Sequence, residues 1–595
     1  MQILTGYRLV VIWVTASFNC ALASAQVNVD TANYGLTRAN ANLGETTLTR
    51  AAVSGKAFGK VGAYLVDGQI YAQPLYVSGL QIPGQGTKNV VFIATMNDSV
   101  YAMDADAPSA TNPLWQVSLG APLPSTALPD VNDVNPQIGI LSTPVIDVSA
   151  QVLYVVAETF ESGAPVFRLH ALSLLNGQET RNGPVVIVAS INGTGSDAVN
   201  GVIEFDPFWH LQRPGLALAN GTVYVAFGSH GDAGIYHGWV MAYNSTNLQH
   251  QTAVFSSTPN GKGGGIWQSG RALAVDHSGN VFVATGNGDF DGVSNFSDAI
   301  IKLSGSDLSV LDWYTPVPWG YLDANDLDVG STGVILAMGG NLVLTGDKNG
   351  RLINVDSISL GQVESARARD DFRASSAGIF NLALWETDQG TLLYEHDDNG
   401  FLKAYAVTAK AIVPKPVSVG TWRGDSLYQG MVVSSNASSD GIVWEGTGDH
   451  SQPGVPATLH AWNASDLTQE LWNSDMNPGD VLGSFAKFAA PLVANGRVYM
   501  PTFSNQVVVY GLQTANVNPS APQIASVMNG VSLVQTSISP GELLSIFGTN
   551  LGPSSGGEFQ LDISGRVPSV LSGTQVFFDG IAASLLYSSA KQITQ

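Results

Sequence analysis

Apolar segments of strand length recur along the chain at intervals of several tens of residues, each introduced by small or polar residues. Two examples are STPVID from Ser142 and GRALAVDHSG from Gly270. Apolar runs of this length, bounded by turn residues, predict short buried β-strands. Eight such segments occur, near Ala72, Ser142, Arg213, Gly270, Gly330, Ser376, Gln429 and Ala489.

A tight turn and a second strand follow these segments. Asn220-Gly221 leads into TVYVAFG, and Asn495-Gly496 leads into RVYMPTF. Asn-Gly favours the left-handed backbone angles of a type I′ hairpin. A third series of strands, such as SVYAMDA, again has eight members, interleaved with the first eight. They begin at Ser99, Arg168, Gly238, Ala299, Arg351, Phe401, Leu459 and Gln506.

An eightfold repeat of strand and turn, with no segment of convincing helical period, predicts an all-β protein. We expect an eight-bladed β-propeller of four-stranded blades. Because a ring of blades must protect its strand edges, the last blade is expected to borrow a strand from near the N-terminus. A solenoid is disfavoured, since the spacings are irregular and each unit holds too many strands.

Two segments carry a family resemblance. VYAMDADAPSATNPLWQVSLG, between Ser99 and Gly120, and LHAWNASDLTQELW from Leu459 resemble the repeat of pyrroloquinoline quinone (PQQ)-dependent dehydrogenases and their PQQ-like relatives. The resemblance covers roughly residues 60–512. In that repeat an alanine packs under a tryptophan of the outer strand, which implies that Trp115 and Trp472 are structural docking residues. The resemblance indicates the fold, because one fold hosts many functions.

The domain plan follows from these patterns. We expect the propeller over residues 26–512 and a polar, proline-bearing linker over 513–522. From 523 to 595 the pattern changes, and SPGELLSIFGTNLG resembles the opening of immunoglobulin-like TIG modules. We expect a small immunoglobulin-like β-sandwich there. It is expected to be truncated, since such modules need strands beyond the point where this sequence stops.

The N-terminal segment has the pattern of an export signal. Arg8 precedes an apolar run, and Ala23-Ser24-Ala25 supplies small residues at a cleavage site. This predicts a signal peptide over residues 1–25, too short to anchor the chain, and a secreted or periplasmic protein. The single cysteine, Cys20, lies inside this segment; a lipoprotein site is an alternative that the preceding Asn19 disfavours. We expect no disulfide in the mature chain and no membrane span.

Composition and net charge exclude a disordered chain and argue against binding of nucleic acid. Of the 595 residues 45% are hydrophobic and 12% charged, which excludes a disordered chain. The net charge of −22, without any basic run, argues against nucleic-acid partners, because the surface repels phosphate.

Motifs for catalysis are missing. The sequence has no CxxCH, HExxH or GxSxG and no phosphate-binding glycine loop. The quinoprotein alcohol dehydrogenases that it resembles typically carry an adjacent cysteine pair beside the cofactor, which the mature chain lacks. We expect a non-catalytic scaffold that binds a small molecule, glycan or protein and needs no cofactor. The alternative is a divergent oxidoreductase for alcohols or sugars that uses PQQ and calcium.

Oxygen-rich turns are the metal candidates. Asp323, Asn325, Asp326 and Asp328 crowd six residues, and a second turn holds Asp289, Asp291, Asn295 and Asp298. Such side chains suit calcium, but neither turn has EF-hand spacing, and capping of β-turns is the favoured interpretation. A zinc site is the corresponding hypothesis for the group His210, His230, Asp232 and His237. Hydrogen bonds in turns and between blades are again favoured.

The channel mouth offers the better ligand site. Residues just before each innermost strand of a propeller surround the mouth of its central channel, and most of these are polar here. The predicted ring is Gln73, Ser142, Arg213, Gln268 with Ser269, Asp328, Arg373 with Ser375, Gln429 and Lys487, with Trp267 as an aromatic face. Converging polar groups suit a small anionic or polyhydroxylated ligand. The alternative is that they hydrogen-bond between blades and hold water.

Overall fold

The computed structural model divides the chain into two compact units, with the division between Leu512 and Gln513. The structure describes residues 27–128, 134–363, 371–396, 400–424, 428–449, 451, 454–513, 522–534, 539, 541–561, 565–578 and 581–595. The predicted signal peptide and most of the expected linker lie outside the described residues.

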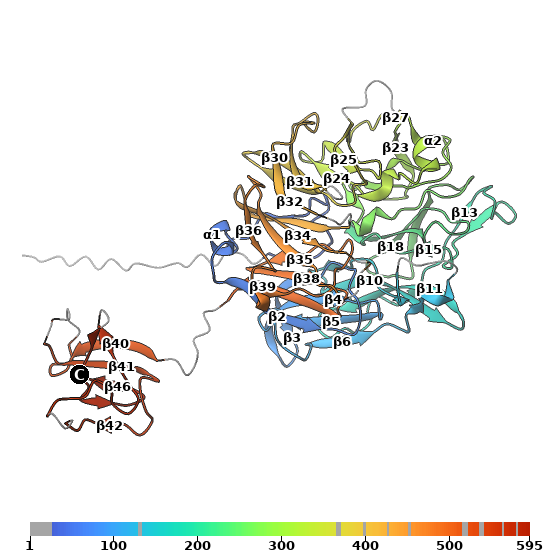
Figure 1. Ribbon diagram of the computed structural model, residues 1–595. Coiled ribbons are helices and arrows are strands. Elements are labelled where there is room, and N and C mark those ends of the chain that lie inside the picture. The colour runs from blue at the N-terminus through green and yellow to red at the C-terminus, as the bar shows by residue number, and fades with distance from the viewer. Residues whose placement is uncertain are drawn as a thin grey trace, which may run out of the picture. The chain divides into compact units, whose positions relative to one another are not determined.

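The first unit is an eight-bladed β-propeller, as the repeat predicts (Figure 1). Blades 1 to 4 are built as follows. Blade 1 has β3 (Leu75–Ile82), β4 (Gly86–Ala94), β5 (Ser99–Asp104) and β6 (Trp115–Ser118). Blade 2 has β9 (Val145–Asp147), β10 (Val152–Glu161), β11 (Ala164–Ser173) and β12 (Val185–Val186). Blade 3 has β16 (Ala217–Ala219), β17 (Thr222–Ser229), β18 (Trp239–Asn244) and β19 (Gln251–Ser256), with β15 (His210–Leu211) also paired to β17. Blade 4 has β20 (Ala274–Val275), β21 (Val281–Ala284), β22 (Ile300–Leu303), β23 (Val310–Thr315) and β27 (Gln362–Val363).

Blades 5 to 8 repeat the pattern. Blade 5 has β24 (Ile335–Ala337), β25 (Leu342–Gly346), β26 (Arg351–Asp356) and β28 (Phe372–Arg373). Blade 6 has β29 (Ala383–Thr387), β30 (Gly390–His396), β31 (Phe401–Val407) and β32 (Ser418–Arg423). Blade 7 has β33 (Gly430–Asn436), β34 (Ser439–Thr447), β35 (Thr458–Asn463) and β36 (Glu470–Asn473), with β1 (Ala41–Asn42) parallel to β33. Blade 8 has β37 (Leu492–Ala494), β38 (Arg497–Pro501), β39 (Gln506–Leu512) and β2 (Phe58–Leu65).

Smaller elements occur in addition to the four-stranded blades. They are the hairpins β7 (Leu123–Pro124) with β8 (Gln137–Ile138) and β13 (Ser190–Asn192) with β14 (Val202–Glu204), the helices α1 (Arg50–Val53) and α2 (Trp319–Ala324), and the 3-10 turns Ser125–Ala127, Gln268–Gly270, Val329–Ser331 and Pro478–Asp480. Within the described ranges, no helix has the length and apolar character needed to cross a bilayer.

The ring closes as predicted. Strand β2, from near the N-terminus, pairs antiparallel with β39 of the last blade, from Phe58 opposite Leu512 to Leu65 opposite Gln506. The Asn-Gly hairpins also have the expected backbone, with positive φ angles at Asn220 and Gly221 of 49° and 76°. Strand β2 thus supplies the outermost strand of blade 8 and joins the two ends of the propeller.

Apolar packing between neighbouring blades holds the ring. Among the described residues, eight hydrophobic clusters each fill the space between two adjacent blades. Trp115 pairs with Ala102 across β5 and β6, and its Nε1 donates to the carbonyl of Leu174 in blade 2 at 2.8 Å. Trp472 pairs with Ala461, and its ring meets that of Phe58 in blade 8 edge-on at 4.9 Å. Both tryptophans therefore contact the next blade.

The segment from Val29 to Asn42 runs inside the ring, which the sequence pattern did not predict. Its backbone hydrogen-bonds to the innermost strands of six blades, at Tyr76, Ile146, Val275, Leu336, Leu384 and Val433. The other edge of each of these strands is already paired with the second strand of its blade, so the bonds use the edge that faces the axis. We call residues 29–42 the inner belt; it lies within the channel.

The second unit is a small all-β module. Strands β40 (Gln523–Asn529), β41 (Leu544–Thr549), β46 (Gln592–Thr594), β45 (Tyr587–Ser588) and β42 (Gly557–Glu558) form one sheet, in that order, and β43 (Phe577–Phe578) pairs with β44 (Ile581–Ala582). Its core is formed by Ile546, Leu551, Leu571, Leu585 and Ile593. Its assignment to the TIG modules stays a prediction.

Candidate functional site

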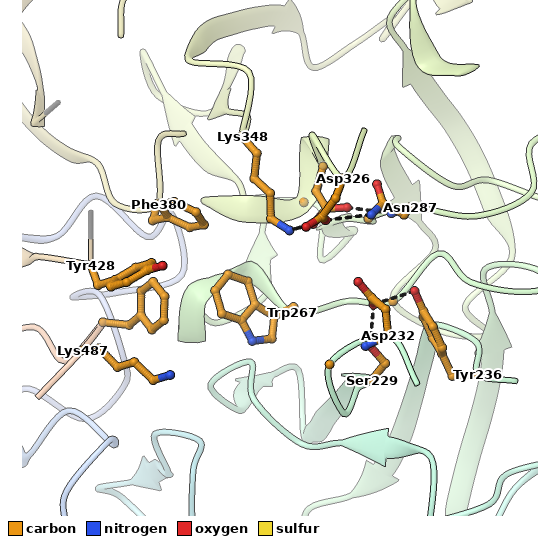
Figure 2. A pocket seen from close by; sticks show the side chains of 16 residues that line it. Ser229, Asp232, Tyr236, Trp267, Asn287, Asp326, Lys348, Phe380, Tyr428 and Lys487 are labelled. Atoms are coloured by element: carbon orange, nitrogen blue, oxygen red, sulfur yellow. Dashed lines mark hydrogen bonds and ion pairs between the residues drawn. The ribbon is translucent and has the colours of Figure 1, made fainter. Parts of the chain in front are cut away.

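A cavity of about 420 Å³ lies where loops of blades 3 to 8 converge on the channel mouth (Figure 2). Two kinds of loop build it: those that precede an innermost strand and those that join the second strand of a blade to the third. Successive strands of a blade run antiparallel, so both kinds lie at the same end of the blade. The side chains discussed below are Ser229, Asp232, Tyr236, Trp267, Asn287, Asp326, Asp328, Lys348, Phe380, Tyr428, Lys487 and Phe488.

One wall of this mouth pocket is aromatic. Trp267, Phe380, Tyr428 and Phe488 come from the loops before the innermost strands of blades 4, 6, 7 and 8. Ring centroids of Phe488 lie 4.9 Å from Trp267 and 4.8 Å from Tyr428, both edge-to-face. Edge-to-face aromatic pairs contribute stabilisation in addition to that from the apolar surface they bury. In Figure 2 Phe380 and Tyr428 lie at the left of the pocket, beside Trp267 in the centre, and Lys487 lies below them.

The facing wall is an ion-pair network. The Nζ atom of Lys348 lies 2.6 Å from Asp326 Oδ1 and 2.6 Å from Asp328 Oδ2. The backbone N–H of Asn287 donates to Asp328 at 2.8 Å, and its side-chain amide donates to Asp326 at 2.8 Å. The other amide atom, Asn287 Oδ1, is buried and has no hydrogen-bond partner among the residues that the structure describes.

Burial and charge oppose each other in this network. Burial raises the pKa of Asp328, and the nearby Lys348 ammonium counteracts only part of that rise. For Lys348, burial lowers the pKa, but the carboxylates of Asp328 and Asp326 outweigh it, and the net pKa is above its usual value. Lys348 therefore stays charged at neutral pH and holds both carboxylates.

A third group completes the rim. Asp232 accepts hydrogen bonds from the hydroxyls of Ser229 at 2.7 Å and Tyr236 at 2.6 Å. These residues come from the end of β17 and the loop that follows it. Figure 2 shows them on the same side of the pocket as Lys348 and Asn287.

The predicted mouth ring divides between several places. Trp267, Asp328 and Lys487 line the mouth pocket. Gln73, Arg213, Gln268 and Ser269 line a second, smaller cavity in the channel. Ser142 and Gln429 are buried in the propeller, and neither lines these two cavities. Ser375 is also buried, next to β28.

Arg373 lies elsewhere than the sequence pattern placed it. It is exposed on β28, the outermost strand of blade 5, and donates to the carbonyls of Ser375 and Ser376. The prediction took SAGIFNLALW, from Ser376, as the entry into the innermost strand of blade 6, and only its last three residues belong to that strand, which begins at Ala383. The residue that reaches the pocket from this loop is Phe380.

Hydrogen bonds within the protein engage most side chains of the acidic turns, but the buried Oδ2 atom of Asp298 has no hydrogen-bond partner among the described residues. Asp323 accepts from the N–H of Gly288 at 2.7 Å, and Asn325 donates to the carbonyl of Tyr321 at 2.8 Å. Burial raises the pKa of Asp291, but backbone N–H groups of residues 293–295 outweigh it and bring that pKa to about 2. Asp298 accepts from the N–H of Val329 at 3.2 Å. Across the described ranges, no three His, Cys, Asp or Glu side chains are arranged to hold a metal ion.

The other turn residues take part in local contacts. Asp289 accepts from the N–H of Lys262 at 3.0 Å, and Asn295 donates to Asp291 at 2.8 Å. Both contacts fix loop geometry.

The histidines join neighbouring segments. His210 Nε2 accepts from the N–H groups of His237 and the Trp239 side chain, at 3.2 and 3.1 Å. Burial lowers the pKa of His210 to about 3, so its ring is neutral. His237 contacts Thr258 and Asp197, whereas His230 lies 3.5 Å from Glu158.

Sequence reasoning missed much of the pocket. Lys348 lies in the DKNG hairpin, which pattern alone marks as an ordinary turn, and Asn287 follows β21 in the same way. One signal could have found them: turns after the second strand of each blade point toward the same mouth as the loops before the first strand. The aromatic residues Phe380, Tyr428 and Phe488 precede innermost strands and needed only the correct strand register.

Comparisons with known proteins agree with this architecture. No family model matches the chain, and no curated protein matches it. Among solved structures, the quinohemoprotein alcohol dehydrogenase from Comamonas testosteroni is similar, with a TM-score of 0.54 and 14% identity over 84% of this chain and 82% of that one. The fold is that of these quinohemoprotein propellers. The enzyme ADHIIG from Pseudomonas putida HK5 is similar too, with a TM-score of 0.51 and 15% identity over 86% and 84% of the two chains. Identities this low show the fold alone.

Proposed function

We propose that this chain is an exported, non-catalytic propeller whose mouth pocket binds a small ring-shaped, polyhydroxylated molecule such as one sugar unit of a glycan. One observation carries the proposal: an aromatic wall faces a wall of carboxylates, an amide and an ammonium group across one cavity. Export rests on the sequence of residues 1–25 alone. A TIG-like C-terminal module would serve as a spacer or adhesive extension.

The two walls suit the two sides of a sugar ring. Its C–H face is apolar and packs against aromatic rings, here Trp267 and Tyr428. Its hydroxyls donate to carboxylates such as Asp232 and accept from the ammonium of Lys348. Asn287 Oδ1, which is buried and unpaired within the described part of the chain, offers one further acceptor. A volume of about 420 Å³ lies within the range of small-molecule sites, roughly 300–1,000 Å³.

A calcium-bound quinone does not fit the residues present. A divalent cation needs several free oxygen ligands, but the ammonium of Lys348 already lies between Asp326 and Asp328, 2.6 Å from each. The adjacent cysteine pair implied by the family resemblance is also missing, because the one cysteine is Cys20. The mouth pocket therefore supports binding by hydrogen bonds and aromatic contact, and we derive no redox step from it.

A saccharide panel tests the proposal. Neutral hexoses, uronic acids and short oligosaccharides are titrated into the purified full-length chain by calorimetry. We expect at least one to bind, and we expect Trp267→Ala to weaken that binding tenfold or more. Trp422→Ala is the matched control, because Trp422 lies on β32, the outermost strand of blade 6, away from the pocket lining. Binding that is equal in both variants would place the sugar elsewhere.

A further inference from the structure

Behind the mouth pocket lies a second cavity, of about 20 Å³, in the central channel. Phe380 and Phe488 line both cavities and so form the wall between them. On another side the small cavity is lined by Ala32 and Asn33 of the inner belt. It is therefore an internal site, separate from the one proposed to bind sugar.

Three buried arginines surround this part of the channel. Arg38, Arg213 and Arg271 have relative exposures of 0%, 3% and 4%. Arg213 and Arg271 line the cavity, and Arg38 belongs to the belt beside it. In the part of the chain that the structure describes, none of the three lies within 4.0 Å of a carboxylate oxygen. Asp30 of the inner belt is an acidic group whose charge acts on Arg38. Burial of the remaining positive charge, on Arg213 and Arg271, is costly.

The protein satisfies Arg271 but not Arg213. Arg271 donates to the carbonyls of Thr332 at 2.8 Å, Leu382 at 2.7 Å and Arg38 at 2.5 Å. Arg213 makes one long hydrogen bond, from Nη1 to the Leu141 carbonyl at 3.2 Å, and its charge lies 5.8 Å from the ring centre of Tyr71. Its Nη2 atom is buried and has no hydrogen-bond partner among the described residues.

The remaining lining is polar and uncharged. Gln73 and Thr143 face the cavity from blades 1 and 2, and Ser269 faces it from the loop before blade 4. Burial lowers the pKa of Arg213 to about 10, so the guanidinium stays charged at neutral pH. A charged donor with an unused N–H, a polar lining and no acidic residue form a site for a negative ion.

We propose that this cavity binds one small monovalent anion, with chloride as the fitting species, on the Nη2 side of Arg213. A cavity needs roughly 10–15 Å³ to hold a particle the size of water, so about 20 Å³ takes one such ion and leaves no room for sulfate or phosphate. The anion offsets the charge of Arg213, and it thereby stabilises the joint between the inner belt and the blades. A carboxylate of a mouth ligand is the other source of negative charge, and it would have to pass Phe380 and Phe488.

Thermal unfolding of the full-length chain tests this site. Sodium chloride or bromide is compared with sodium methanesulfonate at equal ionic strength, since methanesulfonate is too large for the cavity and has no hydroxyls for the mouth pocket. We expect the melting midpoint to rise with halide concentration and to saturate, as for a ligand that binds only the folded state. Arg213→Met should abolish this halide dependence, and the exposed Arg373→Met should keep it. Halide dependence that survives in Arg213→Met would overturn the proposal.

A second measurement does not depend on how well the variant folds. Crystals of the unsubstituted protein in bromide should show an anomalous peak within hydrogen-bonding distance of the Arg213 guanidinium. Bromide confined to the surface would overturn the site. Another result would also overturn the chloride site: glucuronate raises the melting midpoint of the unsubstituted chain but not of Arg213→Met, and chloride has no effect on either. The anion beside Arg213 would then be the carboxylate of a mouth ligand.

Discussion

Lys348 and Asp328 form the central ion pair of the mouth pocket, with Nζ 2.6 Å from Oδ2, although the hairpin of β24 and β25 separates them along the chain. The backbone N–H of Lys348 also donates to the carbonyl of Asp328 at 3.0 Å. The side-chain and backbone contacts together fix the polar wall against blade 5. The pocket is thus built before any ligand arrives.

Replacing Lys348 with methionine should destabilise the propeller at neutral pH. The change leaves the carboxylate of Asp328 largely buried without its partner, and we expect the free energy of unfolding to fall by roughly 2–3 kcal/mol. The loss is smaller than for a fully buried ion pair, because Lys348 keeps some exposure. Removing the ammonium raises the already raised pKa of Asp328 further. A raised pKa gives stability at low pH that is lost as pH rises through it. The deficit should therefore be small at pH 4 and large at pH 8.

Urea unfolding at both pH values measures this difference. Asp328→Asn added to Lys348→Met should restore most of the stability, because it removes the isolated carboxylate. Lys410→Met, at an exposed loop position, should have little effect at either pH. A deficit for Lys348→Met that does not vary with pH would contradict the ion-pair account.

Asp98 should limit stability at alkaline pH. It is fully buried in blade 1, and burial, followed by the charge of Glu158, raises its pKa well above the usual value. The protonated form is favoured in the fold, so stability is complete below the unfolded-state pKa and declines as pH rises. We expect Asp98→Asn to match the original chain in stability near pH 4 and to exceed it at pH 8, where the buried carboxyl of the original chain is disfavoured.

Asp147 provides a control of opposite sign. Burial raises its pKa, but hydrogen bonds from the Ser149 hydroxyl and nearby N–H groups outweigh this and lower it overall. A lowered pKa gives stability above the unfolded-state pKa that is lost as pH falls. Asp147→Asn should therefore lose stability at pH 8 relative to pH 4, opposite to Asp98→Asn. If both variants shift in the same direction, the buried-carboxyl explanation for Asp98 fails.

The docking tryptophans should differ in how they tolerate replacement. Trp115→Ala and Trp472→Ala should each cost roughly 3 kcal/mol or more, because each leaves a cavity between blades. Trp115→Phe should cost about 1 kcal/mol more than Trp472→Phe. Of these two tryptophans, only Trp115 donates an Nε1 hydrogen bond within the described residues, to Leu174. Thermal unfolding measures both pairs. An unchanged midpoint for the two alanine variants would remove their assignment to the blade interfaces.

The ring was predictable from the sequence because its signal is local. Each blade is recognisable from an apolar strand, a turn such as Asn220-Gly221 and a second strand, and this pattern repeats eight times. Closure by β2 followed from the need to cover strand edges. The inner belt could not be predicted in this way, because its ladder of hydrogen bonds to the blades uses backbone atoms that every sequence carries. Side chains such as Arg38 and Asn40 add bonds to blade carbonyls, but no sequence pattern marks them.

The site was predictable only in part, for reasons of register and depth. Trp267, Asp328 and Lys487 precede innermost strands and reach the pocket. Arg373 does not, because it belongs to β28 of blade 5 and the innermost strand of blade 6 begins only at Ala383. Arg213 precedes its strand as expected but lies deeper in the channel. A position in the repeat fixes which end of a blade a residue occupies, not how far it lies from the axis.

The central claim is tested most directly by calorimetric titration of the protein with PQQ, with and without calcium, and with the saccharide panel. Dye-linked turnover of simple alcohols and aldoses is measured alongside. We predict that a saccharide binds, that calcium confers no binding of PQQ, and that no substrate is turned over, because Lys348 already occupies the carboxylates of Asp326 and Asp328. Tight, calcium-dependent binding of PQQ with turnover would contradict the account and make this propeller an oxidoreductase.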